Sequence, residues 1–294
     1  MFELKPYLAE RRELVEHALD LHMPPKHERP ALLHEAMRYS VFAGGKRIRP
    51  ILCLAAAEAV GGRAEDALLP AIALEALHTY TLIHDDLPAM DNDELRRGRP
   101  TCHIAYGEAT AILAGDALLT LAFEWLAESR APKPYLPNQF ALELAEAAGS
   151  RGVIGGQVED LAAEGKPPSA DLVDYIHLHK TAALIRAAVR MGGIAGGAKA
   201  KELDALTVYG GNIGLAFQIA DDILNETSSA GALGKAAGSD RERRKMTYVA
   251  LYGVETARSK AQELTDQAIA RLENRRGETE PLEAIARYIV ERDR

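Results

Sequence analysis

Apolar residues recur at helical spacing along most of the chain, whereas alternating runs of β-branched residues are scarce. Between positions 66 and 84, Leu69, Ile72, Ala76 and Ile83 lie three, four and seven positions apart, the spacing of one buried helix face. Ala, Leu, Glu and Arg dominate these segments and favour helix. The pattern therefore predicts long helices over residues 66–84, 110–128, 169–191, 202–226 and 246–272.

Glycine and proline clusters separate these helical segments without forming a long linker. We therefore predict a single domain over residues 1–294, folded as an all-α bundle of about ten helices. Residues 228–240 are rich in Gly, Ala and Ser, and we expect them to form a mobile loop. The predicted breaks lie at residues 24–25, 44–45, 61–62, 131–137, 165–168 and 192–197.

Charge and cysteine content narrow the classes of partner. The formal net charge is -8, so we expect no broad basic surface for nucleic acid, and any phosphate site has to be local. Two cysteines, Cys53 and Cys102, make no disulfide framework. The charged N-terminus has no apolar signal core, and no uninterrupted apolar run reaches about 18 residues. We therefore expect a cytoplasmic protein without a membrane span.

An acidic cluster follows directly after the first of the predicted long helices. Asp85, Asp86, Asp91 and Asp93 lie around Pro88, which ends or distorts the helix. The carboxylates then gather at the negative pole of the helix dipole, where they repel one another unless a cation is bound. Mg²⁺ that also binds substrate phosphates suits such oxygen ligands. The alternative is a solvated acidic loop, which the preceding buried helix and the basic residues that follow disfavour.

Those basic residues are Arg96, Arg97 and Arg99, five to eight positions after the last metal-type carboxylate, Asp91. Arginine binds phosphate through a planar and often bidentate contact. Such a cluster is more often a plain surface patch, but its position next to the acidic motif indicates a diphosphate clamp.

A second acidic pair lies far along the chain. On a helix, Gln218, Asp221, Asp222 and Asn225 share one polar face through spacings of three and four. Buried carboxylates without partners are costly, and a shared metal removes that cost. The alternative is a solvent-exposed stripe.

Two further basic segments are candidate anion sites. Lys46 and Arg49 follow two glycines, although the segment lacks the spacing of a P-loop. Lys180 and Thr181 place a cation and a hydroxyl side by side in a helical segment. Each segment taken alone is a weak signal.

Together these residues resemble the trans-prenyltransferase (polyprenyl synthetase) family, and within it the bacterial farnesyl diphosphate synthases. The resemblance runs from about residue 39 to residue 258. Its most specific part is residues 78–101, which are similar to the family's first Asp-rich motif in its DDxxxxD form. The resemblance implies a helical bundle around a central apolar cavity, a homodimer, and the condensation of isopentenyl diphosphate with an allylic diphosphate.

The resemblance also implies residue roles. Asp85 and Asp91 would hold two Mg²⁺ ions and Asp221 a third, making three ions with bound diphosphate. Lys180, Thr181 and Gln218 would stabilise the allylic cation through their dipoles. Arg96, Lys180, Thr181, Gln218 and Lys235 would bind the allylic diphosphate, and Lys46, Arg49, His78 and Arg97 would bind isopentenyl diphosphate.

The chain departs from the family pattern at two positions. Asn225 stands where the second motif usually carries its third Asp, which puts metal affinity at that site in doubt. Ala182 replaces the glycine of the usual Lys-Thr-Gly, and we expect little effect because alanine is small.

Product length should depend on what closes the tail pocket beneath Asp85. Thr81 lies one turn earlier on the same helical face and the bulky Tyr80 lies beside it, and in the family an aromatic at this position goes with short products. We therefore expect farnesyl diphosphate, with geranylgeranyl diphosphate as the alternative product.

Three other functions stay open. The dipeptide His84-Asp85 also fits an HD-type metal phosphohydrolase, although that chemistry needs further histidines and no second acidic pair. A class I terpene cyclase shares the ionisation step but has a different second motif. A regulatory subunit of a partner synthase would explain Asn225, but the intact first motif argues against it.

Overall fold

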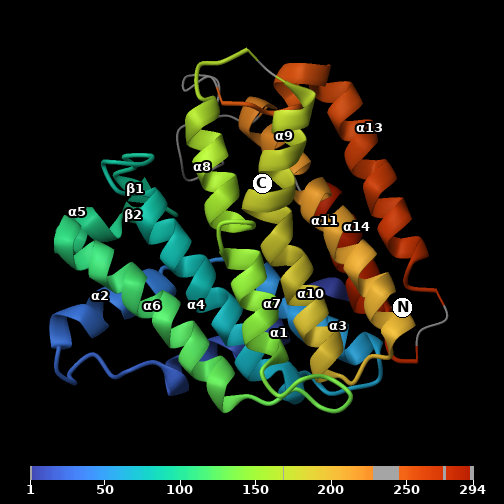
Figure 1. Ribbon diagram of the computed structural model, residues 1–294, viewed down its shortest axis with the longest axis horizontal. Coiled ribbons are helices and arrows are strands. Elements are labelled where there is room, and N and C mark those ends of the chain that lie inside the picture. The colour runs from blue at the N-terminus through green and yellow to red at the C-terminus, as the bar shows by residue number, and fades with distance from the viewer. Residues whose placement is uncertain (1, 168, 228–244, 274–275, 292–294) are drawn as a thin grey trace.

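The structure, a computed structural model, describes residues 2–167, 169–227, 245–273 and 276–291. Within these residues the chain is helical apart from one two-stranded hairpin, so the predicted all-α bundle is confirmed (Figure 1). The elements, in chain order, are α1 (Leu4–His22), α2 (Ala31–Val41), α3 (Ile48–Ala59), η1 (Ala64–Ala67), α4 (Leu68–Asp85), β1 (Leu95–Arg96), β2 (Arg99–Pro100), α5 (Cys102–Tyr106), α6 (Glu108–Glu128), α7 (Gln139–Ala148), α8 (Val153–Ala163), α9 (Ala170–Ile176), η2 (His177–Ala182), α10 (Ala183–Ala195), α11 (Ala200–Thr227), α13 (Tyr248–Ala270) and α14 (Glu280–Glu291).

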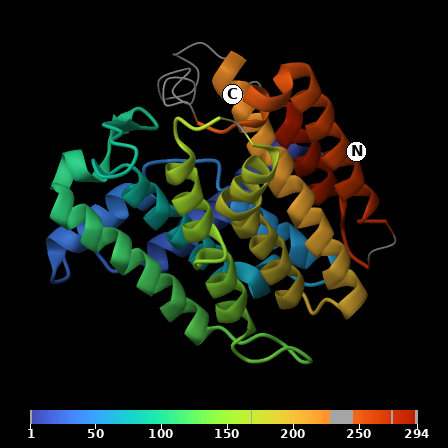
Figure 2. The ribbon, with the colours of Figure 1, turned by 45° about the horizontal axis from the view of Figure 1, so that its top comes forward.

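Helix α4 lies at the centre of the bundle, because its apolar residues cover more than one face. Ala71, Ile72, Leu74 and Leu77 are fully buried. The helix packs against α6 on one side and α3 on another, while α10 packs against both α3 and α11. Helix α13 covers α11 on the far side of the bundle, as both ribbon views show (Figure 2).

The direction of the helices brings polar residues from distant segments to one end of the molecule. Helices α4, α8 and α11 all finish at the end that is uppermost in Figure 1, and α9 to α10 run back from it. The acidic residues at the carboxyl ends of α4 and α11 therefore lie at the same end of the bundle.

Two details of the third predicted helix, residues 169–191, differ from the prediction. The segment is not one regular α-helix, because residues His177–Ala182 form a π-helical turn, a feature that often marks functional sites. The predicted break at 192–197 begins too early. Gly192 lies within α10, where a Cβ would collide with the carbonyl oxygen of Cys53 on α3, so this glycine allows close helix packing. The chain turns only at Gly196 and Gly197.

The expected loop at 228–240 and its Lys235 lie outside the residues that the structure describes. Their predicted roles therefore stay predictions.

One of the described helices, α6, is long and apolar enough to cross a membrane by length and composition, with a mean hydropathy of 1.4. Asp116 and Glu124 interrupt its apolar residues, so the sequence pattern predicted no span there. A core helix passes the same test, so it is weak evidence for a span. Helix α6 packs along α4, while Ile112 and Leu113 are exposed on its outer side.

Candidate active site

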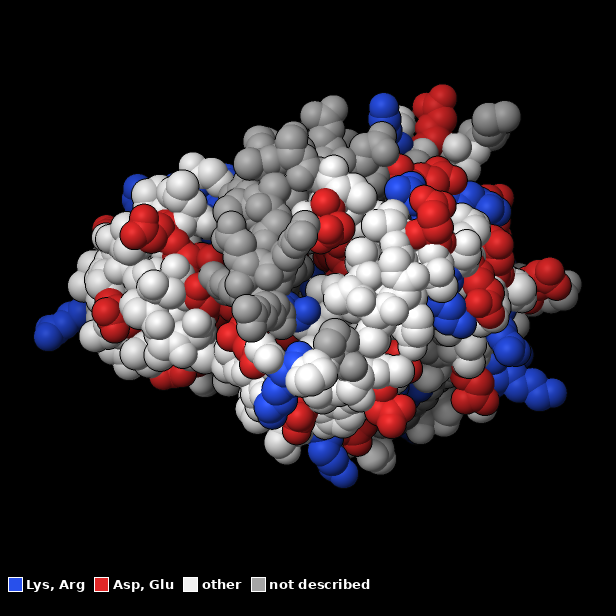
Figure 3. Space-filling view, turned by 90° about the horizontal axis from the view of Figure 1, so that it is seen from above, with Lys and Arg blue, Asp and Glu red and all other residues white. Residues whose placement is uncertain are grey.

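A cavity of about 220 Å³ lies at the end of the bundle where α4, α8 and α11 finish. Seen from above, acidic and basic side chains both occur on this face of the molecule (Figure 3). The cavity brings residues of the first acidic motif together with residues of the second acidic helix. Its charged and polar lining consists of Asp85, Asp91, Arg96, Asp160, His177, Lys180, Thr181, Gln218, Asp222, Lys245 and Thr247.

The first acidic motif turns back on itself after α4 ends. The backbone N–H of Asp91 donates a 2.8 Å hydrogen bond to the carbonyl oxygen of Asp85, so the two residues lie side by side. Burial raises the pKa of Asp85 to about 6; Lys180 opposes the rise and Asp91 adds to it. The carboxylate is therefore held in a place that is costly for its charge, and a bound cation would remove that cost.

Arg96 is fixed beside this motif by the hairpin of β1 and β2. Its Nε donates hydrogen bonds of 2.8 Å to both carboxylate oxygens of Asp86. Asp86 is buried and thus orients the arginine. Arg96 lines the cavity, where a diphosphate clamp was predicted.

Arg97 points away from Arg96 toward the glycine pair that precedes α3. Its guanidinium donates a hydrogen bond to the carbonyl oxygen of Gly44. A Cβ on Gly45 would collide with the same guanidinium, so the glycine is required for this approach. Arg97 is therefore brought next to the segment that carries Lys46 and Arg49, with which it was expected to bind isopentenyl diphosphate.

Lys180 projects from the π-helical turn onto α8. Its Nζ donates a 2.5 Å hydrogen bond to Oδ2 of Asp160, and Lys245 Nζ lies 3.5 Å from the same oxygen. The π-helical turn packs so closely against α8 that a Cβ on Gly156 would collide with the backbone nitrogen of Lys180. The two lysines and Asp160 form a compact charged group.

Asp160 and Lys245 are site residues that the sequence analysis missed. Asp160 lies on an amphipathic helix of only eleven residues, and only the Gly155–Gly156 pair before it hinted at close packing. Lys245 ends a basic run at 241–245 that resembles a solvated surface segment. Neither residue carries a local spacing that distinguishes it.

The second acidic helix is held by a chain of hydrogen bonds. Thr181 Oγ1 donates to Gln218 Oε1 at 2.7 Å, and Gln218 Nε2 donates to Asp222 Oδ1 at 2.9 Å. The backbone N–H of Tyr248 donates to Asp222 Oδ2 at 2.8 Å. The predicted proximity of Thr181 and Gln218 is therefore present. Asp221 is partly buried on the same turn of α11, but it is not among the residues that line the cavity.

His177 lies beside this group of hydrogen-bonded residues. It is buried with Nε2 3.4 Å from Asp222 Oδ2, and its ring stacks on Tyr248 with centroids 5.6 Å apart. Burial lowers the pKa of His177 to about 4, which keeps the imidazole neutral.

Of the residues predicted to bind isopentenyl diphosphate, Arg49, His78 and Arg97 lie close together. Arg49 Nη1 lies 3.2 Å from His78 Nε2, and the pKa of His78 is lowered by burial first and then by Arg49 and Arg97. A neutral His78 can accept this hydrogen bond. Lys46 is exposed, with Nζ 5.7 Å from the ring centroid of Tyr288. Arg47, by contrast, is buried in an ion pair with Glu75 at 2.6 Å and is structural.

The carboxylates fit a metal that is bound together with substrate. In the described part of the chain no three His, Cys, Asp or Glu side chains converge closely enough to hold an ion by themselves. Asp85 and Asp91 nevertheless supply the oxygen ligands that Mg²⁺ prefers, and burial, which raises the pKa of Asp85 although Lys180 lowers it, makes the ionised carboxylate costly without a bound cation. Diphosphate oxygens and waters would complete the coordination.

Tyr80 lies on the same helix as Asp85, about one turn and a half deeper in the bundle. It is buried, and its ring meets that of His84 edge to face with centroids 5.4 Å apart. The position is the one that was predicted to close the tail pocket.

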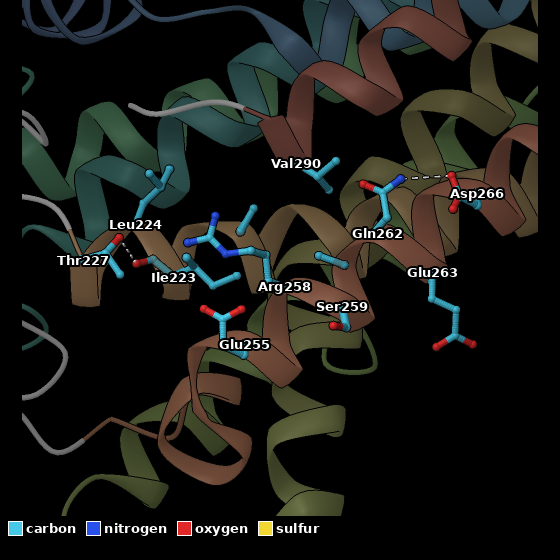
Figure 4. Close-up of a pocket in the computed structure, with 12 residues that line it drawn as sticks. Ile223, Leu224, Thr227, Glu255, Arg258, Ser259, Gln262, Glu263, Asp266 and Val290 are labelled. Carbon is cyan, nitrogen blue, oxygen red and sulfur yellow. Dashed lines mark hydrogen bonds between the residues drawn. The ribbon is translucent and has the colours of Figure 1, made fainter.

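A larger cavity, about 850 Å³, lies between α11 and α13 and does not include any of the predicted site residues (Figure 4). Ala220, Ile223 and Leu224 form its apolar side, while Glu255 and Arg258 extend into it from α13. Its polar groups come mainly from one exposed helix and do not resemble the converging carboxylates and cations of the 220 Å³ cavity.

Comparisons with known proteins agree with this site. The family described as polyprenyl synthetase matches residues 30–288. Geranylgeranyl diphosphate synthase of Cyanophora paradoxa is 47% identical over 99% of this chain and 97% of its own length. Farnesyl diphosphate synthase of Escherichia coli K12 is 48% identical over 88% of this chain and 89% of its own length.

The fold agrees with solved structures as well. An FPP/GFPP synthase from Zymomonas mobilis superposes with a TM-score of 0.84 at 40% identity and covers 98% of both chains. A geranylgeranyl pyrophosphate synthetase from Pyrococcus horikoshii superposes with a TM-score of 0.86 at 32% identity, over 98% of this chain and 99% of that one.

Proposed function

The chain belongs to the polyprenyl synthetase family of prenyltransferases, and we propose that it is a Mg²⁺-dependent short-chain synthase that makes farnesyl diphosphate. It would condense isopentenyl diphosphate with dimethylallyl and then geranyl diphosphate. The observation that carries the proposal is the 220 Å³ cavity, in which Asp85 and Asp91 face Lys180, Gln218 and Asp222.

The site residues would support the breaking of the carbon–oxygen bond to diphosphate. Mg²⁺, when bound, would neutralise charge on the leaving group. Arg96, Lys180 and Lys245 would supply further positive charge, because all three line the cavity. Thr181 and Gln218, already hydrogen-bonded to each other, would present dipoles to the allylic cation.

The attack by isopentenyl diphosphate would depend on a separate group of basic residues. Arg49 and His78 would hold isopentenyl diphosphate beside the cavity, with Lys46 and Arg97. The electron pair of its double bond would form the new carbon–carbon bond, and a proton would leave to the released pyrophosphate. The apolar walls of the bundle would exclude water from the cation.

The product length rests on Tyr80. A buried aromatic ring about one turn and a half below Asp85 leaves little room for a longer tail and favours a C15 product. The relatives include both farnesyl and geranylgeranyl diphosphate synthases, so geranylgeranyl diphosphate is the second candidate.

The direct test is to incubate the purified chain with Mg²⁺, isopentenyl diphosphate and dimethylallyl diphosphate, and to separate the products by chain length. The expected result is farnesyl diphosphate. A C20 product would support the alternative. Release of phosphate from the allylic diphosphate alone would favour a phosphohydrolase, and no reaction without a partner protein would favour a regulatory subunit.

We also propose that the protein is a homodimer joined through the outer faces of α6 and α8. Both helices lie on the near side of the bundle in both ribbon views. Leu113 of α6 is 58% exposed and Val158 of α8 is 59% exposed. Exposed apolar patches of this kind are typical of protein interfaces. Their apolar neighbours on these helices are Ile112 and Ile154.

Analytical ultracentrifugation tests the dimer. Leu113→Glu is expected to give a monomer, whereas Leu21→Glu, at a position on α1 that is 71% exposed, leaves the dimer intact. A monomeric parent protein would contradict the proposal.

A further inference from the structure

Three side chains that line the 220 Å³ cavity form a chain of hydrogen bonds with a definite direction. The chain runs from Thr181 through Gln218 to Asp222. At its far end the backbone N–H of Tyr248 donates to Asp222 Oδ2, and a backbone N–H can only donate. His177 lies beside the same oxygen, with Nε2 3.4 Å away. Asp222 is therefore held as an ionised carboxylate that accepts hydrogen bonds and donates none.

The carboxylate of Asp222 fixes the direction of the whole chain. Because it has no hydrogen to donate, Gln218 has to turn Nε2 toward it, and this nitrogen lies 2.9 Å from Oδ1. The amide oxygen of Gln218 then faces Thr181 and accepts its hydroxyl proton at 2.7 Å. A hydroxyl group has only one proton. Thr181 can therefore offer only lone pairs to a ligand in the cavity.

The hydrogen bonds of Asp222 account for its burial without a metal ion. The residue is 3% exposed, and both of its carboxylate oxygens accept hydrogen bonds from protein groups. Charge-assisted hydrogen bonds of this kind offset the cost of burying a carboxylate. The contacts of Asp222 thus serve Gln218 and the rest of the chain.

Close helix packing keeps the members of this chain in place. A Cβ on Gly214 of α11 would lie 2.6 Å from the Cα of Ala182, so α11 packs directly on the π-helical turn. Gly214 lies about one turn before Gln218 on α11. Ala182 directly follows Thr181. Packing therefore sets the separation of Thr181 and Gln218, and the hydrogen positions alone decide which of them donates.

We propose that Asp222 is a positioning residue, which directs the lone pairs of Thr181 toward the positive charge of the allylic cation. The proposal rests on the proposed function and deepens it, because it gives Asp222 a task other than metal binding. When the carbon–oxygen bond breaks, its electron pair leaves with diphosphate, and positive charge stays on C1 to C3. A hydroxyl oxygen that faces this charge stabilises it, whereas a hydroxyl proton that faces it opposes ionisation.

The substitution Asp222→Asn should reverse the chain at almost unchanged volume. The N–H of Tyr248 selects the oxygen of the introduced amide, so the NH₂ group of that amide faces Gln218. Gln218 then has to turn its own oxygen toward position 222 and its NH₂ group toward Thr181. Thr181 would accept instead of donating, and its proton would be free to turn into the cavity.

This reversal should affect catalysis more than substrate binding. We expect kcat of Asp222→Asn to fall about 10²-fold, while KM for geranyl diphosphate changes by less than about twofold. Asp204→Asn, the same substitution at an exposed position of α11, is the control and should match the parent protein. An unchanged kcat in Asp222→Asn would overturn the proposal.

Two non-reactive probes separate the direction of the chain from metal binding. One carries an ammonium group in place of C3 of geranyl diphosphate, and the other is geranyl thiolodiphosphate, whose tail is uncharged. In calorimetry with Mg²⁺, Asp222→Asn should bind the ammonium probe about tenfold more weakly and the thiolodiphosphate within about twofold of the parent. Equal losses for both probes would show that Asp222 acts on the metal ion or the diphosphate, against the proposal.

A double-variant cycle separates the direction of the chain from the charge of Asp222. Thr181→Val removes the hydroxyl at similar volume. Because Asp222 is proposed to act through that hydroxyl, adding Asp222→Asn to Thr181→Val should weaken binding of the ammonium probe by less than about threefold. An undiminished loss in the Thr181→Val background would mean that the negative charge acts directly on the cation, and the proposal would be wrong.

Neutron diffraction of the parent protein tests the direction of the chain even if Asp222→Asn fails to fold. The deuterium of the Thr181 hydroxyl is expected on the line to Gln218 Oε1. A deuterium that points into the cavity contradicts the proposal. Failure of the proposed function is recognised separately, because the parent protein would then make no prenyl diphosphate, whatever the direction of this hydroxyl.

Discussion

Lys245 Nζ lies 3.3 Å from Asp91 Oδ1, a contact between residues 154 positions apart in the sequence. The same ammonium is 3.5 Å from Asp160, so one lysine neutralises carboxylates of two separate elements. It occupies the position that a cation bound to Asp91 would take. If Asp91 holds a metal ion, as we propose, Lys245 would compete with that ion for the carboxylate, and a bound diphosphate would accept contacts from both.

Replacing Lys245 should have opposite effects on metal and on substrate. In Lys245→Met, Mn²⁺ alone should bind several-fold more tightly, as followed by electron paramagnetic resonance, because the competing ammonium is gone. A non-reactive allylic thiolodiphosphate with Mg²⁺ should bind at least about tenfold more weakly, since a charge-assisted hydrogen bond is lost. Lys260→Met, on the outer side of α13, is the control and should change neither. Weaker Mn²⁺ binding in Lys245→Met would contradict the competition.

Removing the charge of Asp85 should stabilise the metal-free protein while it destroys activity. Holding this carboxylate ionised at pH 7.5, with its pKa raised to about 6, costs on the order of 3 kcal/mol of folding free energy. Asp85→Asn should gain that amount in urea unfolding with chelator present, and the gain should fade as the pH falls from 6 to about 4, where the native carboxyl is neutral. Activity should fall about 10²- to 10³-fold.

The control for Asp85 is Asp266→Asn on the exposed side of α13, for which neither stability nor activity should change. A loss of stability in metal-free Asp85→Asn would mean that the carboxylate is already compensated by Lys180.

Local spacing in the sequence determines where the helices form, whereas packing between distant segments determines other features of the fold. The long helices follow from apolar periodicity, and the break after Asp85 follows from Pro88, because both are local effects. The π-helical turn at His177–Ala182 has no such signature, since it depends on the close approach of α8 through Gly156.

The site was predictable to the same extent. Asp85, Arg96 and Gln218 belong to dense clusters of chemically related residues, and all three line the cavity. Asp160 and Lys245 lie outside the clusters that the sequence pattern singled out, and they acquire a role only when α8 and the residues before α13 meet. A charged residue that acts only through tertiary contacts cannot be identified from the spacing of residues in the sequence.

Buried histidine should make the protein less stable in mild acid. The pKa of His177 is about 4 in the folded protein and near 6.5 when unfolded, so the unfolded state binds the proton first. This contribution to stability is complete above pH 6.5 and is lost as the pH falls toward 4, by about 3 kcal/mol. His78, whose pKa is also lowered, acts in the same direction, whereas Asp85 opposes both.

Because the effects of these three groups on stability overlap in pH, the test compares the variant with the parent protein. His177→Phe keeps a ring beside Tyr248 and has no proton to bind. Urea unfolding between pH 4.5 and pH 7 should show a shallower loss of stability with acid in the variant than in the parent. Identical slopes would mean that His177 is solvated and protonates normally.

The length of the product should respond to the ring of Tyr80. The side chain is buried on α4 beneath Asp85, and truncation to alanine opens the space next to His84. Tyr80→Ala should therefore extend a growing chain by at least one isoprene unit and yield geranylgeranyl diphosphate, measured by chromatography of the dephosphorylated products. Tyr80→Phe keeps the ring and should still stop at farnesyl diphosphate. If Tyr80→Ala also stops at C15, another residue closes the pocket, and if the parent already makes C20, the ring is not a barrier.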